Sequence, residues 1–157
     1  MTSSAGSRIK VRLTRTSRRK IEVLFTPLRR MTKEILTNAG IEAAEVSVSF
    51  VGRGLVRRLN TEYLGHDWVT DVIAFDLSSP GDQLLVGDIY ICVLQARDQS
   101  ARFGVSPEEE LFRLTAHGTL HLLGHDHGDQ AGREAMIELQ ELAVRKFYRR
   151  SMAGVIG

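Results

Sequence analysis

The feature that most constrains the fold is a helix whose two ends and interior are all marked in the sequence. Its start is Ser106-Pro107-Glu108-Glu109, which places a hydroxyl at the N-cap, a proline at the first helical position and an acid at the third. Gly124 is a typical helix-ending residue, because glycine readily adopts the left-handed conformation. The residues between are apolar nearly all round, and they include Leu111, Phe112, Leu114, Ala116, Leu120, Leu122 and Leu123. This pattern predicts a central, buried helix.

The same helix carries a cluster of histidines. Four of the five histidines lie between residues 117 and 127, namely His117, His121, His125 and His127. His117 and His121 are four residues apart, so on a helix their Cβ atoms lie on one face, about 5–6 Å apart. A buried imidazole without a partner is costly, and a shared metal ion would satisfy both rings. The alternative is a set of core histidines bonded to backbone carbonyls, which fits one histidine better than several at this spacing.

The third ligand of such a site depends on where the helix ends. If Gly124 ends it, the chain can turn back and bring His127 over the first two histidines. If the helix continues, His125 competes, because it lies four residues after His121. We expect His127, which gives three imidazole nitrogens and a fourth position open to water, as in catalytic zinc sites. Zinc is the expected ion, although nickel, copper or iron would also bind such ligands.

The sequence lacks the general base of a common zinc-protease motif. In H-E-x-x-H proteases a glutamate follows the first histidine. Here that position is Gly118. A metalloprotease is therefore disfavoured in spite of the helical histidine spacing. Either another acid serves as the base, or a zinc-bound water with its pKa lowered towards about 7 acts unaided.

The rest of the chain divides into further helices and strands. Period-two alternation or β-rich composition predicts strands at 9–13, 45–51, 70–77 and 84–94. The last two could form a hairpin around the turn at 79–82. Helical spacing and end signals predict helices at 26–38, 53–63, 96–103, 107–123 and 130–150.

Composition limits the class of protein. The chain has 157 residues, of which 43% are hydrophobic and 25% charged, as in one globular domain spanning 1–157. No apolar run is long enough for a membrane span, and the N-terminus lacks the apolar region of a secretory signal. The single cysteine, Cys92, excludes a disulfide framework and a four-cysteine zinc site. We therefore expect a cytoplasmic protein without membrane partners.

Positive charge is concentrated near the N-terminus. Residues 1–30 hold nine lysines and arginines and one acid, a net charge of +8. Residues 31–157 hold twelve lysines and arginines and eighteen acids, a net charge of −6. We interpret residues 1–25 as a basic, partly flexible arm that either faces a polyanion or is a solvated terminus. A second basic cluster closes the last helix at Arg145, Lys146, Arg149 and Arg150, where the helix dipole favours cations.

Three blocks of the sequence resemble one known family. The first runs from His117 to His127 and has the pattern H-x₃-H-x₅-H, with matching glycines and leucines and an Asp before the last histidine. The second runs from Leu59 to Phe75, and the third is Gly87-Asp88-Ile89-Tyr90-Ile91. Together they resemble the YbeY family of bacterial single-strand endoribonucleases and rRNA maturation factors. The resemblance covers about residues 45–148 and excludes the basic arm before residue 25.

The resemblance implies an α/β (α+β) fold, with a small mixed sheet of about four strands packed with about five helices. It also implies one zinc per chain on His117, His121 and His127, at the end of the central helix. The implied activity is metal-dependent cleavage of single-stranded RNA in 16S rRNA 3′-end maturation and ribosome quality control. The implied partners are ribosomal RNA and ribosomal subunits, with no small-molecule cofactor.

Two positions depart from the family pattern. The residue after Tyr63 is usually an arginine and is here Leu64, and the residue before Asp126 is commonly aromatic and is here His125. If the arginine has a cationic role, His66 and the arginines of the arm are the candidates to supply it. The alternative function is a non-catalytic ribosome-assembly factor with a structural zinc, although an open fourth ligand position disfavours a structural site. The polar segment from His66 to Asp71, between two apolar stretches, is expected at the mouth of the site. No catalytic residue is assigned, and Asp67 and Asp71 are interpreted as turn and strand-edge residues.

Overall fold

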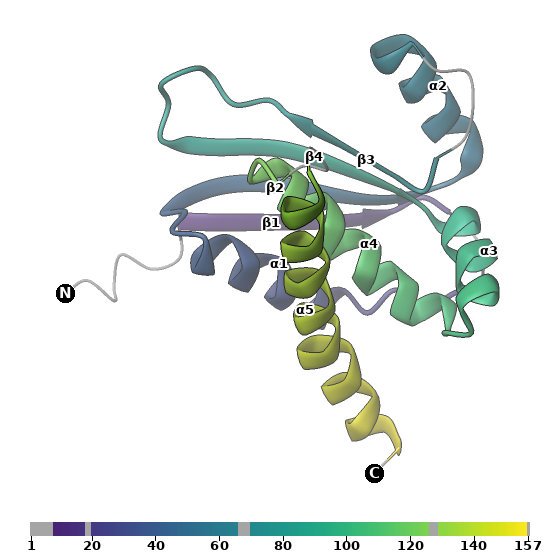
Figure 1. Cartoon of the computed structure of the whole chain (residues 1–157). Helices are drawn as coiled ribbons and strands as arrows, with labels where there is room; N and C mark the ends of the chain where they lie inside the picture. Colours follow the sequence, from purple (N-terminus) through teal and green to yellow (C-terminus); the bar gives the residue numbers. More distant parts are fainter. Residues whose placement is uncertain (1–7, 18–19, 66–69, 126–128, 157) are drawn as a thin grey trace.

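The computed structural model describes residues 8–17, 20–65, 70–125 and 129–156, and it contains a four-stranded mixed sheet (Figure 1). The strand order is β1-β2-β4-β3. The first three strands in this order are parallel, and β3 pairs antiparallel with β4, as expected for a hairpin. The strands are β1 (Arg8–Arg15), β2 (Ala43–Val51), β3 (Val72–Asp76) and β4 (Leu84–Cys92).

Helices cover one face of the sheet, and α2 packs at one end of the other face (Figure 1). They are α1 (Phe25–Asn38), α2 (Arg53–Leu64), α3 (Val93–Phe103), α4 (Pro107–Leu122) and α5 (Gln130–Ile156). On one face, α1 and α4 pack on the strands, and α5 packs on both helices. On the other face, Val56 of α2 packs with Ile73 of β3. The α+β class, with about four strands and about five helices, is confirmed over the part of the chain that the structure describes.

Residues 8–15 of the basic arm form an edge strand of the sheet. This strand is in register with β2, so that Ile9 pairs with Ala44. Alternation along β1 buries Ile9, Val11 and Leu13 in the main core and leaves Arg8, Lys10 and Arg12 exposed. The strand expected at residues 9–13 is confirmed, and over this stretch the basic segment is part of the folded core.

The central helix α4 begins and ends as its sequence predicts. The backbone N–H of Glu109 donates to Ser106 Oγ at 3.0 Å, and Pro107 occupies the first turn. At the other end Gly124 has a φ of 91°, and the backbone N–H of His125 donates to Leu120 O at 3.1 Å, which closes the helix. Most side chains of α4 are buried.

Two glycines allow α4 to lie very close to the sheet. A Cβ atom on Gly118 would lie 2.8 Å from Ile89 Cγ2, and one on Gly87 of β4 would lie 2.6 Å from Leu122 Cδ1. Both distances are below ordinary van der Waals contact, so a side chain at either position would force the facing side chain or the helix to shift. No helix in the described residues is both long and apolar enough to cross a membrane.

Candidate metal centre

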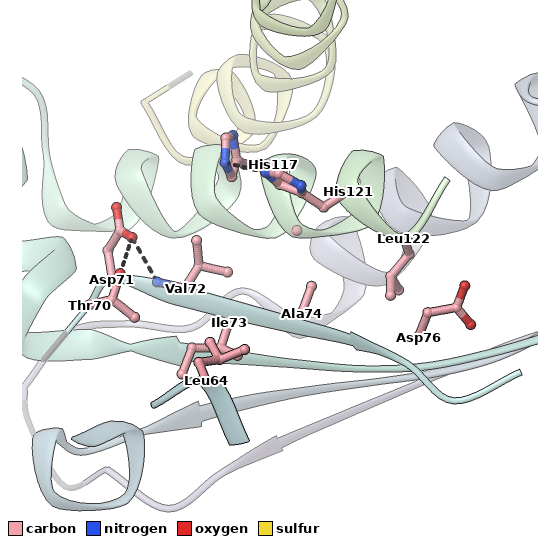
Figure 2. A pocket seen from close by; sticks show the side chains of 11 residues that line it. Leu64, Thr70, Asp71, Val72, Ile73, Ala74, Asp76, His117, His121 and Leu122 are labelled. Carbon is pink, nitrogen blue, oxygen red and sulfur yellow. Dashed lines mark hydrogen bonds between the residues drawn. The ribbon is translucent and has the colours of Figure 1, made fainter. Parts of the chain in front are cut away.

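The structure brings His117 and His121 together on one face of α4. Their Nε2 atoms are 3.1 Å apart, and their ring centroids are 4.7 Å apart (Figure 2). Two nitrogen ligands of a tetrahedral zinc ion, each at about 2.0–2.1 Å, are separated by about 3.3 Å. Two imidazole nitrogens at this separation therefore fit one ion of that size.

The third predicted ligand, His127, lies outside the described residues. Within those residues no group of three metal-binding side chains is found. The competing residue, His125, follows the helix end at Gly124, and its side chain lines a different groove, between α1, α4 and α5. The helix end on which the choice of His127 depended is thus present, and the ligand set itself stays a prediction.

A cavity of about 410 Å³ adjoins the two histidines (Figure 2). It lies between α4 and β3, with Leu64 at the end of α2 on its wall. The lining residues are Leu64, Thr70, Asp71, Val72, Ile73, Ala74, Asp76, His117, Gly118, His121 and Leu122. Its volume is within the usual range for small-ligand sites, and its walls carry both imidazoles and carboxylates.

Asp71 is held in place on the wall of this cavity. Its Oδ1 accepts hydrogen bonds from the Val72 backbone N–H at 2.8 Å and from Thr70 Oγ1 at 3.3 Å. Its Oδ2 accepts from Gln99 Nε2 of α3 at 2.8 Å. The bond to Val72 agrees with the strand-edge interpretation. The place of Thr70 and Asp71 on the cavity wall agrees with the expectation that the polar segment ending at Asp71 lies at the mouth of the site.

The described lining of the cavity is poor in positive charge. It contains two carboxylates, Asp71 and Asp76, and no lysine or arginine. Leu64, at the position where the sequence departs from the family pattern, is 47% exposed and contributes an apolar wall. A phosphate group bound here would therefore need a metal ion, or cations from beyond this lining, to balance its charge.

Close packing around Gly118 explains why a glutamate does not follow His117. The position faces Ile89 and Val72 of the sheet, where a Cβ atom would already be too close. A glutamate here would drive its side chain into the helix–sheet contact, and the helix would have to move. The protease arrangement is therefore excluded by packing as well as by residue type.

A comparison with family models gives a match that covers most of the chain. The model described as Endoribonuclease YbeY matches residues 13–148. The chain belongs to this family. The match begins inside β1, so the expected span of 45–148 was too short by residues 13–44, and excluding the arm was wrong for residues 13–24. The three blocks that carry the resemblance lie between Leu59 and His127, outside β1 and α1.

Individual YbeY proteins give the same result. Endoribonuclease YbeY of Chlorobium luteolum is 35% identical over 134 residues, covering 85% of this chain and 95% of that protein. That of Desulfitobacterium hafniense is 42% identical over 120 residues, covering 71% and 76%. The solution structure of TM1509 from Thermotoga maritima has a TM-score of 0.62 at 24% identity, over 92% of this chain and 93% of that one, which shows the same fold.

The YbeY relatives are named as endoribonucleases, so the expected nuclease class is confirmed at the level of the family. The site offers groups that such chemistry can use, namely a cavity, a pair of imidazoles and a carboxylate held by hydrogen bonds.

Proposed function

We propose that this protein is a zinc-dependent endoribonuclease that cleaves single-stranded RNA during 16S rRNA 3′-end maturation and ribosome quality control in the cytoplasm. Its partners would be ribosomal RNA, which is the substrate, and ribosomal subunits. The observation that carries the proposal is the pair of Nε2 atoms, 3.1 Å apart, on the wall of a cavity in a YbeY-family chain. His117, His121 and His127 are the proposed zinc ligands, with one ion per chain.

Each site residue has a distinct part in this proposal. A zinc ion held here would supply Lewis-acid chemistry for cleavage of a phosphodiester. His117 and His121 would hold it through Nε2. Val72, at the start of β3, packs against Gly118 of α4 and so fixes the cavity wall against the helix.

Asp71 is the carboxylate that we assign to proton transfer. Oδ1 already accepts two hydrogen bonds, whereas Oδ2 accepts one, from Gln99. A carboxylate oxygen has two acceptor sites, so Oδ2 can take a further hydrogen bond from a reacting hydroxyl or water. The three existing contacts fix its direction before substrate binds, as general base catalysis requires.

The alternative, a non-catalytic assembly factor with a structural zinc, is favoured by one observation. The described cavity lining has Leu64, Asp71 and Asp76 but no cation to hold the scissile phosphate. The size of the cavity favours the enzyme, because a purely structural zinc site is closed by four protein ligands and needs no adjoining space.

A nuclease assay separates the two functions. Metal-analysed wild-type protein, His121→Ala and the control His125→Ala are incubated with an RNA that carries an unprocessed 16S rRNA 3′ end. The enzyme predicts cleavage by wild type and by His125→Ala, loss of cleavage in His121→Ala or with a chelator, and recovery on adding zinc. Zinc-loaded wild-type protein that binds this RNA without cleaving it would overturn the nuclease and support the assembly factor.

A further inference from the structure

The imidazole of His117 has a second contact, on the side away from His121. Its Nδ1 atom is 2.9 Å from Oε1 of Gln140, which projects from α5. Gln140 is only 8% exposed, although glutamine is usually a surface residue. A buried amide is held by its hydrogen bonds, so the partners of Gln140 decide which way it faces.

The other end of this amide contacts an ion pair. Gln140 Nε2 donates to Glu141 Oε2 at 3.1 Å. The same carboxylate accepts from Arg113 of α4, with Nε at 2.7 Å and Nη2 at 2.9 Å. Hydrogen bonding from Arg113 lowers the pKa of Glu141, so this carboxylate is ionised and only accepts at neutral pH. A reversed amide would set its oxygen against that carboxylate, which is repulsive.

Arg113 is itself fixed from two further sides. Its Nη1 donates to Glu110 Oε1 at 3.0 Å, and its Nη2 donates to Glu109 Oε2 at 2.9 Å, both from the preceding turn of α4. Glu110 is 3% exposed, so this end of the network is buried. The guanidinium therefore has one orientation, and it holds Glu141 and, through Glu141, the amide of Gln140.

The orientation of Gln140 determines the tautomer of His117. Oε1 of the amide can only accept, so Nδ1 of His117 must carry the proton. In a neutral imidazole the proton on Nδ1 leaves a lone pair on Nε2. That lone pair is on the nitrogen that lies 3.1 Å from His121 Nε2, beside the cavity.

We propose that Gln140, held by the Arg113–Glu141 ion pair, is a positioning residue that keeps His117 in the Nδ1-protonated tautomer and so prepares its Nε2 to bind metal. This inference rests on the proposed metal site. Partners of this kind fix ring orientation and ligand basicity, and losing one typically lowers metal affinity about 10–100-fold.

The test measures tautomer and affinity in the same proteins. Gln140→Leu removes the acceptor at similar size, and Gln83→Leu makes the same change at an exposed site in the β3–β4 loop. In metal-free protein, at a pH where both imidazoles are neutral, ¹⁵N NMR should show His117 protonated on Nδ1 in wild type and Gln83→Leu. Gln140→Leu should show a mixture of tautomers. Competition with a chelator should show zinc affinity lowered about 10–100-fold in Gln140→Leu alone.

A Gln140→Leu protein with the wild-type tautomer and zinc affinity would overturn the inference. If that variant does not fold, Glu141→Leu takes its place, because it removes the carboxylate that orients the Gln140 amide. It should show a mixture of His117 tautomers, and an unchanged tautomer would overturn the inference. Failure of the metal site itself is distinguishable: wild-type protein would then take up no zinc, while the metal-free tautomer would still report on Gln140.

Discussion

A Cβ atom on Gly118 would lie 2.8 Å from Cγ2 of Ile89, so the helix that carries the histidines touches the sheet where no side chain fits. Gly118→Ala gains about 1 kcal/mol in helix propensity but overpacks a buried contact, which costs about 1–3 kcal/mol. We expect a net loss of about 1 kcal/mol in the free energy of unfolding, measured by urea denaturation.

The same substitution at a second helical glycine should have the opposite effect on the free energy of unfolding. Gly54 of α2 has no atom within 4 Å of its Cβ position. Gly54→Ala should therefore increase the free energy of unfolding, by up to about 1 kcal/mol. Equal effects of the two substitutions would mean that the close approach at Gly118 does not exist in solution.

Two of the three acids bonded to Arg113, Glu110 and Glu141, should give opposite pH dependences of stability. Burial raises the pKa of Glu110 above its ordinary 4.5, against the lowering effect of Arg113. The stability that Glu110 contributes is therefore full below pH 4.5 and is lost as pH rises through the raised pKa. As pH rises through this pKa, the free energy of unfolding of wild type should fall relative to that of Glu110→Gln. Denaturation at a series of pH values measures both proteins.

For Glu141 the sign is reversed. The hydrogen bond from Arg113 lowers its pKa below the ordinary 4.5. Its contribution is present above pH 4.5 and is lost as pH falls through the lowered pKa. Relative to Glu141→Gln, wild type should therefore lose stability on acidification. Parallel pH profiles for the two variants would contradict the network described around Arg113.

Asp71→Asn should slow RNA cleavage and leave metal content unchanged. Asparagine keeps the size and the acceptor for the Val72 N–H but cannot accept a proton. The loss of a general base is worth about 10²–10⁴-fold in kcat. Single-turnover cleavage with saturating RNA measures it, with Asp76→Asn as the control on the same cavity wall. A rate equal to that of wild type would remove Asp71 from the chemistry.

The role of β1 in RNA binding is best tested by replacing its charged side chains rather than by deleting the strand. Removing residues 1–20 would also remove β1, whose Ile9, Val11 and Leu13 belong to the core. Replacing the exposed Arg8, Lys10 and Arg12 with glutamine should preserve the fold and weaken RNA binding. For single strands the slope of log K against log salt should flatten by about 0.7 for each phosphate that is no longer neutralised, or about 2 for three. An unchanged slope would show that these side chains do not meet the RNA.

How well the sequence predicted each part depended on the range of the interactions. The ends of α4 follow from Ser106, Pro107 and Gly124, because caps act within a few residues. The meeting of His117 and His121 follows from helical spacing. The bond between His117 and Gln140 joins residues 23 apart on two helices, and no local pattern encodes it. The same holds for the bond between Asp71 and Gln99 of α3, which joins residues 28 apart, although the polar segment ending at Asp71 was expected at the mouth of the site.

X-ray absorption spectroscopy of zinc-loaded protein tests the central claim, the three-histidine metal centre. Wild type and His125→Tyr should each bind one zinc, with three imidazole nitrogens at about 2.0–2.1 Å. His127→Ala should bind zinc much more weakly, because one of the three ligands is gone. Equal losses in His125→Tyr and His127→Ala, or a zinc signal with fewer than three imidazoles in wild type, would contradict the account.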